Sequence, residues 1–376
     1  MASSLGNATI APGQKVGAGR FTLIRPLGAG GMGQVWLAQD EELSKEVALK
    51  FLSAEVSNNP EALRGMRNEV AKAQALTHIN IVRINDLQKH QGETAFISME
   101  YVAGKSLHEL LAEQPQGVFT WETLHPWAQQ LCDALAHAHS QGVVHRDLKP
   151  ANLLVDATGK IKLVDFGIAA TGVKGGGGTT GLTERRRVIG TPWYMSPQQL
   201  DGQPPEVTDD VYALGATLYQ LLTGETPYTA HPGAMKAILE TETVKSIPER
   251  LRELKVTNEI PSQVVAAVME CLAKNATERP QSAREIWERL EKPEESMTEP
   301  EEENEPLPAR PRNPALLLAG GVALLAVLAI VGWYWGMHRP GPRLGKRWTN
   351  SLGMPFVPVP GTKVLFCIWD VRVQDY

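Results

Sequence analysis

The chain has 376 residues, a formal net charge of −5 and 21% charged residues. A surface that binds nucleic acid normally leaves a basic excess, so this balance argues against nucleic acid as the main partner. The three widely separated cysteines, Cys132, Cys271 and Cys367, match neither a disulfide framework nor a metal quartet. They indicate a main domain that folds in a reducing, cytosolic environment.

The first elements in chain order are strands. Residues 1–18 are small, polar and glycine-rich, so we expect a flexible N-terminus, without a cleaved signal peptide. Apolar alternation predicts antiparallel strands at residues 21–24, 34–38, 46–51, 81–87 and 94–101.

A helix is predicted between the third and the fourth of these strands. Asn59-Pro60-Glu61 predicts its start, with a capping residue, a first-turn proline and an acid near the positive end of the helix dipole.

A glycine-rich stretch lies between the first two predicted strands. Gly28, Gly30 and Gly33 let a backbone close over phosphate groups without clashes from Cβ atoms. Gln34-Val35 and a strand follow, where a dinucleotide-binding fold would have a helix. The stretch therefore predicts a phosphate-covering loop, with a plain hairpin turn as the alternative.

Lys50 lies on a predicted strand after this loop. Its ammonium group can contact the α- and β-phosphates of a nucleotide, provided that a carboxylate holds it in place. We expect Glu69, on the following helix, to be that carboxylate. Glu55 and Glu61 are alternatives nearer the start of the helix.

Beyond residue 101 the pattern is mostly helical, and two polar strings carry the remaining chemistry: residues 145–152 (HRDLKPAN) and 165–167 (DFG). Asp147 is the expected base, which orients and deprotonates an acceptor hydroxyl. Asn152 and Asp165 are the expected metal ligands, because oxygen ligands without His or Cys suit Mg²⁺. Together with the loop and Lys50, these strings predict transfer of the γ-phosphoryl of ATP.

Residues from about 20 to 290 resemble the eukaryotic-type (Hanks-type) serine/threonine protein kinases of bacteria. The resemblance implies an α+β, bilobal protein-kinase fold at residues 19–290, with a small antiparallel β-rich N-lobe and a mostly helical C-lobe. Lys149 can neutralise charge on the γ-phosphate, and its place after Asp147-Leu148 implies specificity for Ser and Thr. The implied cofactors are ATP and Mg²⁺, with Mn²⁺ as a substitute, and the implied partners are protein substrates.

The same resemblance assigns further positions. Met99 is the expected gatekeeper, Glu100 to Val102 the hinge that contacts adenine, and Asp210 a helix-start aspartate that braces the catalytic loop. Residues expected to bind ATP are Leu27, Gly28, Ala29, Gly30, Gly31, Met32, Gly33, Gln34, Val35, Ala48, Lys50, Glu69, Met99, Glu100 and Val102.

One position departs from the family pattern. Where relatives close the activation loop with Pro-Glu, this chain has Pro197-Gln198. We expect Gln198 to form a neutral hydrogen bond with Arg279, weaker than the charge-assisted bond that a glutamate would form.

Control by phosphorylation is the next expectation. Arg146 precedes the catalytic aspartate and could pair with a phosphate on the activation loop. Thr183 is the predicted phosphosite, and Thr179 and Thr180 are alternatives. Self-association would allow one copy to phosphorylate another.

The domain is expected to end with a helix that starts at Ser282 and runs to Leu290. Residues 291–314 contain eight Glu and six Pro and predict a disordered linker. Residues 315–335 contain no charge and would span about 31 Å as a helix, so we predict a transmembrane helix at 315–336.

The orientation of this span is ambiguous from charge. More basic residues follow it than precede it, which leans towards a cytoplasmic C-terminal side. A kinase needs cytosolic ATP, however, and we give that argument more weight. We therefore predict a single-pass protein of the bacterial inner (cell) membrane with its kinase domain in the cytoplasm.

Residues 337–376 resemble the opening segment of the formylglycine-generating (sulfatase-modifying) enzyme family and predict a truncated, strand-rich domain; an irregular tail is the alternative. Two other functions remain open. A nucleotide-binding pseudokinase scaffold is disfavoured because Lys50, Asp147, Asn152 and Asp165 are all present. A membrane receptor would need more than the 41 residues that follow Trp335.

Overall fold

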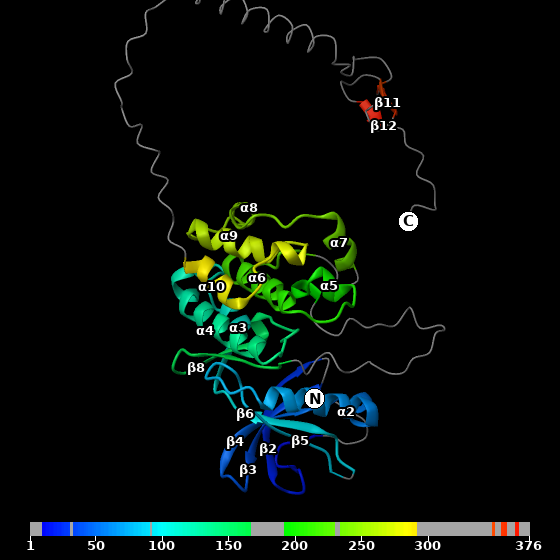
Figure 1. Cartoon of the computed structure of the whole chain (residues 1–376), viewed down its shortest axis with the longest axis vertical. Coiled ribbons are helices and arrows are strands. Elements are labelled where there is room, and N and C mark those ends of the chain that lie inside the picture. The colour runs from blue at the N-terminus through cyan, green and yellow to red at the C-terminus, as the bar shows by residue number, and fades with distance from the viewer. Residues whose placement is uncertain are drawn as a thin grey trace, which may run out of the picture. The chain divides into compact units, whose positions relative to one another are not determined.

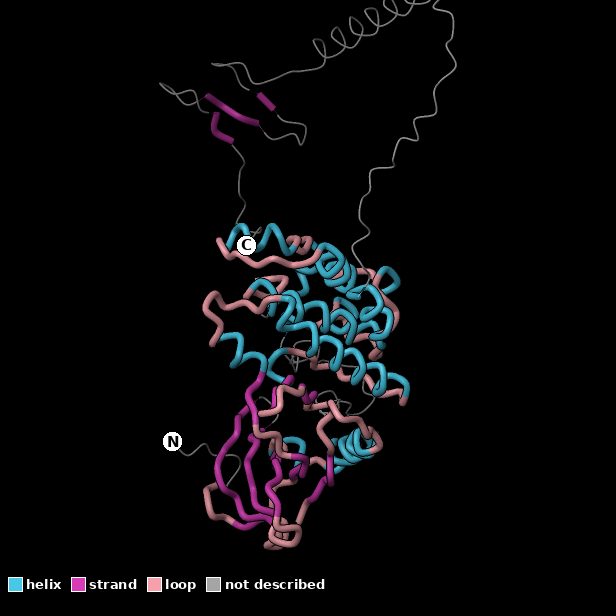
Figure 2. The backbone as a smooth tube through the Cα atoms, turned by 90° about the vertical axis from the view of Figure 1, so that its left-hand side faces the viewer, coloured by secondary structure: helices cyan, strands magenta, loops and turns pink. Residues whose placement is uncertain are grey.

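The computed structural model describes residues 10–30, 33–90, 92–166, 192–229 and 234–291, and three short strands further along the chain. Two compact units are distinguished, Met1–Ser296 and Met297–Tyr376. In the first unit a twisted sheet forms one lobe and a bundle of helices forms the other (Figures 1 and 2). This is the bilobal arrangement that the family resemblance implies.

The N-lobe is built on one antiparallel sheet with the strand order β1-β2-β3-β4-β6-β5. Four of the expected strands are present close to their predicted positions, and the fifth starts at Ile84, three residues later than expected. The strands are β1 Lys15–Val16, β2 Phe21–Gly30, β3 Gly33–Asp40, β4 Lys45–Phe51, β5 Ile84–Gln88 and β6 Phe96–Glu100.

Strand β1 differs from the expectation that residues 1–18 are flexible. Lys15 and Val16 pair with Thr22 and Phe21 of β2. Val16 is buried in the apolar cluster on that face of the sheet. A two-residue strand is too short to produce a recognisable alternation, which explains why the sequence does not reveal it.

Side chains of β4 alternate between two environments. Val47, Leu49 and Phe51 join a cluster that belongs to the N-lobe alone. Ala48 belongs to the large core cluster that continues into the C-lobe. Lys50 lies two residues further along the strand and therefore faces the same side as Ala48, towards the C-lobe.

Helix α2, Pro60–Gln74, packs against β5 (Figure 1). Asn59 caps it as predicted, since its side chain accepts hydrogen bonds from the backbone N–H groups of Glu61 and Ala62. Its buried residues recur every three or four positions, as expected for a helix with one apolar face. They are Leu63, Met66, Val70 and Ala73.

The C-lobe contains most of the helices and a small antiparallel sheet. That sheet has the order β7-β8-β9, with β7 Gly104–Ser106, β8 Leu153–Asp156 and β9 Ile161–Leu163. Helix α1, Ala54–Ser57, belongs to the N-lobe. The C-lobe helices are α3 Leu107–Ala112, α4 Trp121–Ser140, α5 Pro197–Leu200, α6 Val207–Thr223, α7 Met235–Thr241, α8 Ile247–Leu254, α9 Ser262–Cys271 and α10 Ala283–Glu291.

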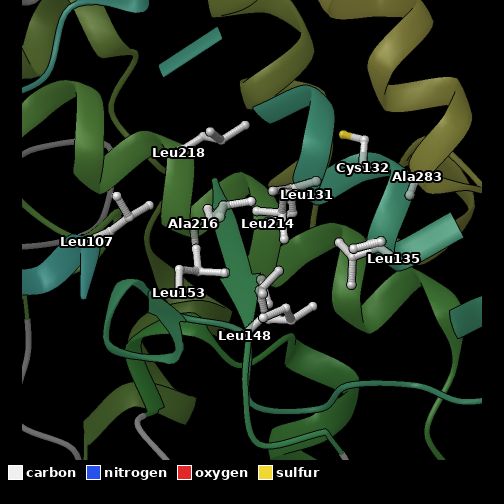
Figure 3. Packing of buried hydrophobic residues seen from close by; sticks show 14 of the residues in the cluster. Leu107, Leu131, Cys132, Leu135, Leu148, Leu153, Leu214, Ala216, Leu218 and Ala283 are labelled. Atoms are coloured by element: carbon white, nitrogen blue, oxygen red, sulfur yellow. The ribbon is translucent and has the colours of Figure 1, made fainter. Parts of the chain in front are cut away.

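Helix α6 is the central helix of the C-lobe, and nearly all of its residues are buried. It lies close to α9, because a Cβ atom at Gly215 would come within 2.5 Å of the Cβ of Cys271. Leu148, from the predicted catalytic loop, is 1% exposed and packs with Leu153 and Leu214 in this core (Figure 3). The loop is thus anchored by a leucine between its polar residues.

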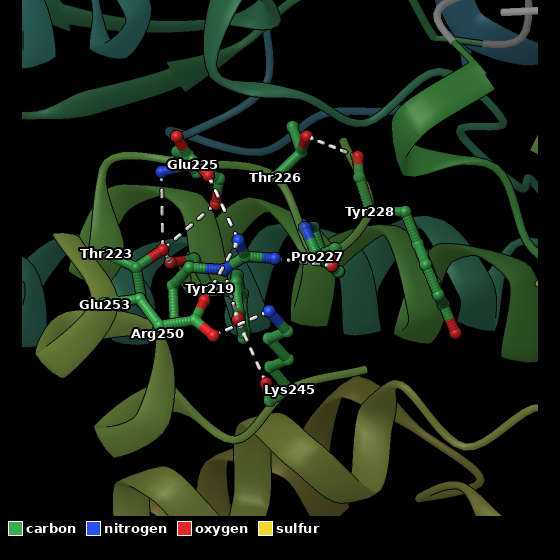
Figure 4. Close-up of polar contacts among 9 residues, drawn as sticks. All are labelled: Tyr219, Thr223, Glu225, Thr226, Pro227, Tyr228, Lys245, Arg250 and Glu253. Carbon is green, nitrogen blue, oxygen red and sulfur yellow. Dashed lines mark hydrogen bonds and ion pairs between the residues drawn. The ribbon is translucent and has the colours of Figure 1, made fainter. Parts of the chain in front are cut away.

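Helix α8 is attached to α6 by a buried arginine (Figure 4). Arg250 donates hydrogen bonds to the hydroxyl of Tyr219, the carboxylate of Glu225 and the carbonyl of Pro227. Tyr219 in turn donates to the carbonyl of Lys245. Burial acts against the charged form, but the contacts with Tyr219 and Glu225 raise the pKa of Arg250 above its usual value.

The end of the domain agrees with the sequence. Helix α10 begins after Ser282, whose hydroxyl accepts a hydrogen bond of 3.1 Å from the backbone N–H of Glu285. Most of the predicted linker and the whole predicted span at 315–336 lie outside the described residues. Among the helices that are described, none is both long and apolar enough to cross a bilayer.

In the second unit the described residues form three short antiparallel strands in the order β10-β11-β12. They are β10 Trp348–Thr349, β11 Pro355–Pro358 and β12 Leu365–Cys367. Strands were expected here. The resemblance of this segment to the formylglycine-generating enzymes stays a prediction.

Candidate active site

The glycine-rich stretch connects β2 to β3. Gly30 pairs with Gly33, while Gly31 and Met32 lie outside the described residues. Gly33 has a φ of 139°, a conformation that residues with a Cβ atom rarely adopt. A Cβ atom there would also overlap the backbone carbonyl oxygen of Phe51. The loop therefore requires glycine at this position.

The strand register places the other expected ATP-binding residues beside one another. Val35 of β3 pairs with Lys50 of β4, and Ala48 pairs with Met99 of β6. Ala48 and Met99 are buried. The carboxylate of Glu100, at the end of β6, forms an ion pair with Lys162 of β9, with 2.7 Å between the Lys162 Nζ and the Glu100 Oε1. This contact ties the expected hinge to the C-lobe.

Leu27, Gly28 and Ala29 lie on the exposed part of β2. Val102, the last residue of the expected hinge, packs against the main core cluster. Gln34 is half-buried at the start of β3.

Lys50 and Asp165 form the ion pair at the centre of the site. The distance between the Lys50 Nζ and the Asp165 Oδ2 is 2.8 Å. Burial acts against the charged form of Asp165, but the positive charge of Lys50 and its hydrogen bond hold the pKa of the carboxyl below its usual value. Asp165 is thus an anion fixed next to a buried ammonium group.

The catalytic loop is held by Asp210, at the start of α6. Its carboxylate accepts hydrogen bonds of 2.7 Å and 2.9 Å from the backbone N–H groups of His145 and Arg146. It also contacts the Nε2 of His139 at 2.8 Å. Burial opposes ionisation, but the hydrogen bond and charge of His139, together with His145, hold the pKa of Asp210 below its usual value. The bracing role implied by the resemblance is confirmed by this geometry.

His139 is a residue that sequence reasoning missed. Its role depends on α4 and α6 lying side by side, and the contact joins residues 71 positions apart. No local pattern could have indicated it.

His145 links the loop to the residues after β9. Its Nε2 contacts the carbonyl of Val164 at 2.8 Å, and its ring packs edge-to-face against Phe166 with 4.7 Å between the ring centroids. Its Nδ1 accepts a hydrogen bond from the backbone N–H of Asp147. The two polar strings are therefore in direct contact.

The carboxylate of Asp147 is fixed by two neighbours in the same loop. The Lys149 Nζ lies 2.7 Å from the Asp147 Oδ2, and the Asn152 Nδ2 lies 3.1 Å from the same atom. The Asn152 Nδ2 also donates a hydrogen bond of 2.7 Å to the carbonyl of Asp147. The three expected residues Asp147, Lys149 and Asn152 are thus brought together.

Glu69 does not occupy the place that the sequence predicts. Its carboxylate lies 3.2 Å from Lys72 and 3.8 Å from the NH1 of Arg146, while Lys50 pairs with Asp165. The expected Lys50–Glu69 ion pair is therefore not formed in this conformation. The physical reason is that the side chains of Lys50, Lys72 and Arg146 could each pair with Glu69. The placement of α2 decides which of these cations Glu69 reaches.

The substituted closing motif of the activation loop behaves as expected. The NH2 group of Arg279 donates a hydrogen bond of 2.7 Å to the Oε1 of Gln198. Arg279 is buried and also donates to the carbonyls of Ala273, Thr208 and Lys274. The candidate phosphosites Thr179, Thr180 and Thr183 lie outside the described residues.

A scan against protein families matches residues 21–289 to the protein kinase domain. The chain belongs to the protein kinase family. Two similar proteins are the serine/threonine-protein kinases PrkC of Bacillus subtilis, 34% identical over 273 residues, and PknB of Mycobacterium tuberculosis, 35% identical over 270 residues. Each match covers 71% of this chain, 39% of PrkC and 42% of PknB. The chain thus spans about two fifths of the length of these relatives.

Among solved structures, this kinase is similar to the kinase domain of Mycobacterium tuberculosis PknI. The TM-score is 0.59 with 25% sequence identity, and the match covers 75% of this chain and 98% of the PknI domain.

The residues present fit the nucleotide and metal of a protein kinase. Lys50 presents a buried ammonium group for phosphate oxygens. The amide nitrogen of Asn152 donates its hydrogen bonds to Asp147, so the Oδ1 of Asn152 is the atom of this side chain that could bind a metal. Asp165 contributes a carboxylate whose lowered pKa keeps it ionised. Such oxygen ligands suit Mg²⁺, which would neutralise the charge of the β- and γ-phosphates when bound.

Proposed function

We propose that this chain is a membrane-anchored protein kinase that transfers the γ-phosphoryl of ATP to Ser and Thr hydroxyls of proteins. The observation that carries the proposal is the position of the Asp147 carboxylate, which contacts both Lys149 and Asn152 in a loop fixed to the core. The family and the bacterial relatives support the same chemistry.

The reaction assigns a role to each of these side chains. The oxygen of the acceptor hydroxyl bonds to the γ-phosphorus, and Asp147 accepts the proton that this hydroxyl loses. The bond between that phosphorus and the β–γ bridging oxygen breaks, and ADP leaves. Lys149 lies 2.7 Å from Asp147 and can balance the charge of the transferred group. Lys50 holds the α- and β-phosphates.

A substitution of the base tests this proposal directly. Asp147→Asn keeps the shape of the side chain but removes the proton acceptor, so phosphate incorporation from γ-labelled ATP should fall by about a hundredfold or more. Asp133→Asn, at an exposed position of α4, is the matched control and should retain full activity. Equal incorporation by both variants, with phosphosites mapped, would contradict the proposal.

We also propose activation by trans-autophosphorylation at Thr183, with Thr179 and Thr180 as alternative sites. Arg146 supports this, because its Nε is buried without a hydrogen-bond partner among the described residues and its NH1 lies 3.8 Å from the carboxylate of Glu69. A phosphate could satisfy this guanidinium group. Phosphopeptide mapping of the wild type and of Lys50→Met decides the matter, since an unmodified loop in active enzyme would refute it.

Membrane attachment and location belong to the same proposal. The uncharged residues 315–335 support a membrane anchor, and the need for ATP supports a cytoplasmic kinase domain. In spheroplasts of a bacterium that expresses the chain, residues 1–290 should resist added protease until the cells are lysed. Digestion before lysis would exclude this orientation.

A further inference from the structure

The peptide group between Arg146 and Asp147 sets the direction in which the base points. Arg146 has a φ of 70°, which is unfavourable for a residue with a Cβ atom and persists only where surrounding contacts enforce it. Asp210 binds the backbone N–H of Arg146, and His145 accepts from that of Asp147. The carbonyl oxygen of Arg146 is bound by a third residue, Gln199, at 3.2 Å.

Gln199 is placed by the first turn of α5 (Figure 1). Its backbone N–H donates a hydrogen bond of 3.0 Å to the hydroxyl of Ser196, and its Oε1 accepts one of 3.0 Å from the backbone N–H of Ser196. This reciprocal pair is a capping box. Because the Oε1 faces an N–H donor, the Nε2 is left to face the carbonyl of Arg146.

Ser196 is itself held by α6. It is fully buried, and its hydroxyl donates a hydrogen bond of 2.5 Å to the Oδ1 of Asp209. The Oδ2 of Asp209 accepts a hydrogen bond of 2.9 Å from the backbone N–H of Glu206. Direct hydrogen bonds therefore run from Asp209 through Ser196 and Gln199 to the carbonyl of Arg146.

Two consecutive aspartates at the start of α6 thus hold the same residue of the catalytic loop. Asp210 binds the N–H of Arg146 directly, and Asp209 acts on its carbonyl through two intermediate side chains. We propose that Gln199 is a positioning residue for phosphoryl transfer, which fixes the Arg146–Asp147 peptide so that the carboxylate of Asp147 meets the acceptor hydroxyl. The proposal rests on the proposed kinase activity.

Gln199→Glu separates this role from the stability of α5. Glutamate at the third position of a helix is the usual partner in a capping box, so the bond to the N–H of Ser196 is retained. The donor to Arg146 is lost, and a carboxylate oxygen is placed against the carbonyl. Gln203→Glu makes the same chemical change on an exposed side chain a few residues away and is the matched control.

The 376-residue chain is first incubated with ATP and Mg²⁺ until its phosphate content is constant. Turnover is then measured with myelin basic protein as the acceptor. For Gln199→Glu we expect kcat to fall about tenfold, which corresponds to the loss of roughly one hydrogen bond to the loop. The KM for ATP and the melting temperature should stay those of the wild type, as should all values of Gln203→Glu. A kcat within twofold of the wild type would overturn the proposal.

Two further measurements keep the result decisive. Hydrogen–deuterium exchange of the segment around residues 143–150 should be faster in Gln199→Glu than in Gln203→Glu; this readout needs no activity, and equal exchange counts against the positioning role. Ser196→Ala should lower kcat in the wild-type background and have little further effect in Gln199→Glu. Fully additive losses would show that the two residues act independently, which also contradicts the proposal.

Discussion

The carboxylate of Glu69 lies 3.8 Å from the guanidinium group of Arg146. The ammonium group of Lys50, for which Glu69 was the expected partner, lies 2.8 Å from Asp165 instead. The guanidinium group of Arg146, for which we propose a phosphate partner on the activation loop, therefore contacts the carboxylate that was expected to hold Lys50. A phosphate on the activation loop would compete for Arg146 and leave Glu69 able to reach Lys50.

This relationship predicts that Glu69→Gln acts only on the phosphorylated enzyme. In that form the variant should bind a non-hydrolysable ATP analogue about tenfold more weakly, because Lys50 loses its charged partner. In the phosphatase-treated enzyme the Kd should change by less than about twofold, since Glu69 is then engaged by Arg146. Calorimetry with Glu61→Gln as the control measures both values. An equal loss of affinity in both forms would exclude the exchange of partners.

The sequence is sufficient to predict what depends on local pattern. The strands follow from alternation, α2 from its cap, and the residues of the catalytic loop from their fixed spacing. Asp147, Lys149 and Asn152 lie in one loop, so their meeting requires no knowledge of the tertiary fold. Leu148 shows how that loop is fixed, since a leucine among polar residues points into the core.

Contacts between distant elements could not be predicted in the same way. The partner of Glu69 depends on the placement of α2, and several cations lie within reach. The contact between His139 and Asp210 requires α4 and α6 to be adjacent. Gln199 bonds to the carbonyl of Arg146, 53 positions away in the chain, so this contact depends on the placement of α5 beside the catalytic loop.

Gly33→Ala should destabilise the N-lobe and weaken nucleotide binding. The added methyl group would meet the backbone carbonyl oxygen of Phe51, and alanine is strained at a φ of 139°. We expect the free energy of unfolding to fall by about 2 kcal/mol, as measured by urea denaturation. Gly28→Ala is the comparison for stability, because a Cβ atom there meets no atom of the described residues within 4 Å. Equal unfolding midpoints for the two variants would contradict this explanation.

Arg279→Lys should be a costly substitution although it keeps the charge. The guanidinium group of Arg279 spreads its hydrogen bonds over Gln198 and three backbone carbonyls, which a single ammonium group cannot reproduce. Unsatisfied buried carbonyls should lower the stability by about 2 kcal/mol, or about 4–8 °C in melting temperature for a domain of this size. Arg284→Lys, on the exposed face of α10, should change little. If the melting temperature of Arg279→Lys equals that of the wild type, the several N–H donors of the guanidinium group are not needed for stability.

Asp210 predicts a pH dependence of stability with a definite sign. The pKa of Asp210 is lowered in the folded protein, whereas in the unfolded chain it lies near its ordinary value of about 3.9. The unfolded state therefore binds more protons in that range, and the stability contributed by Asp210 is present above about pH 4 and lost as the pH falls further.

The comparison of the wild type with Asp210→Asn isolates this contribution. At pH 7 the variant should be less stable by about 3 kcal/mol, because an amide nitrogen would replace an acceptor for buried N–H groups. This difference should shrink as the pH falls below about 4, while Asp165 and the other carboxylates titrate equally in both proteins. Urea denaturation from pH 7 to pH 3 measures the difference. If it stays constant over the whole range, Asp210 is not an anion that holds the N–H groups of His145 and Arg146, and its bracing of the catalytic loop does not depend on charge.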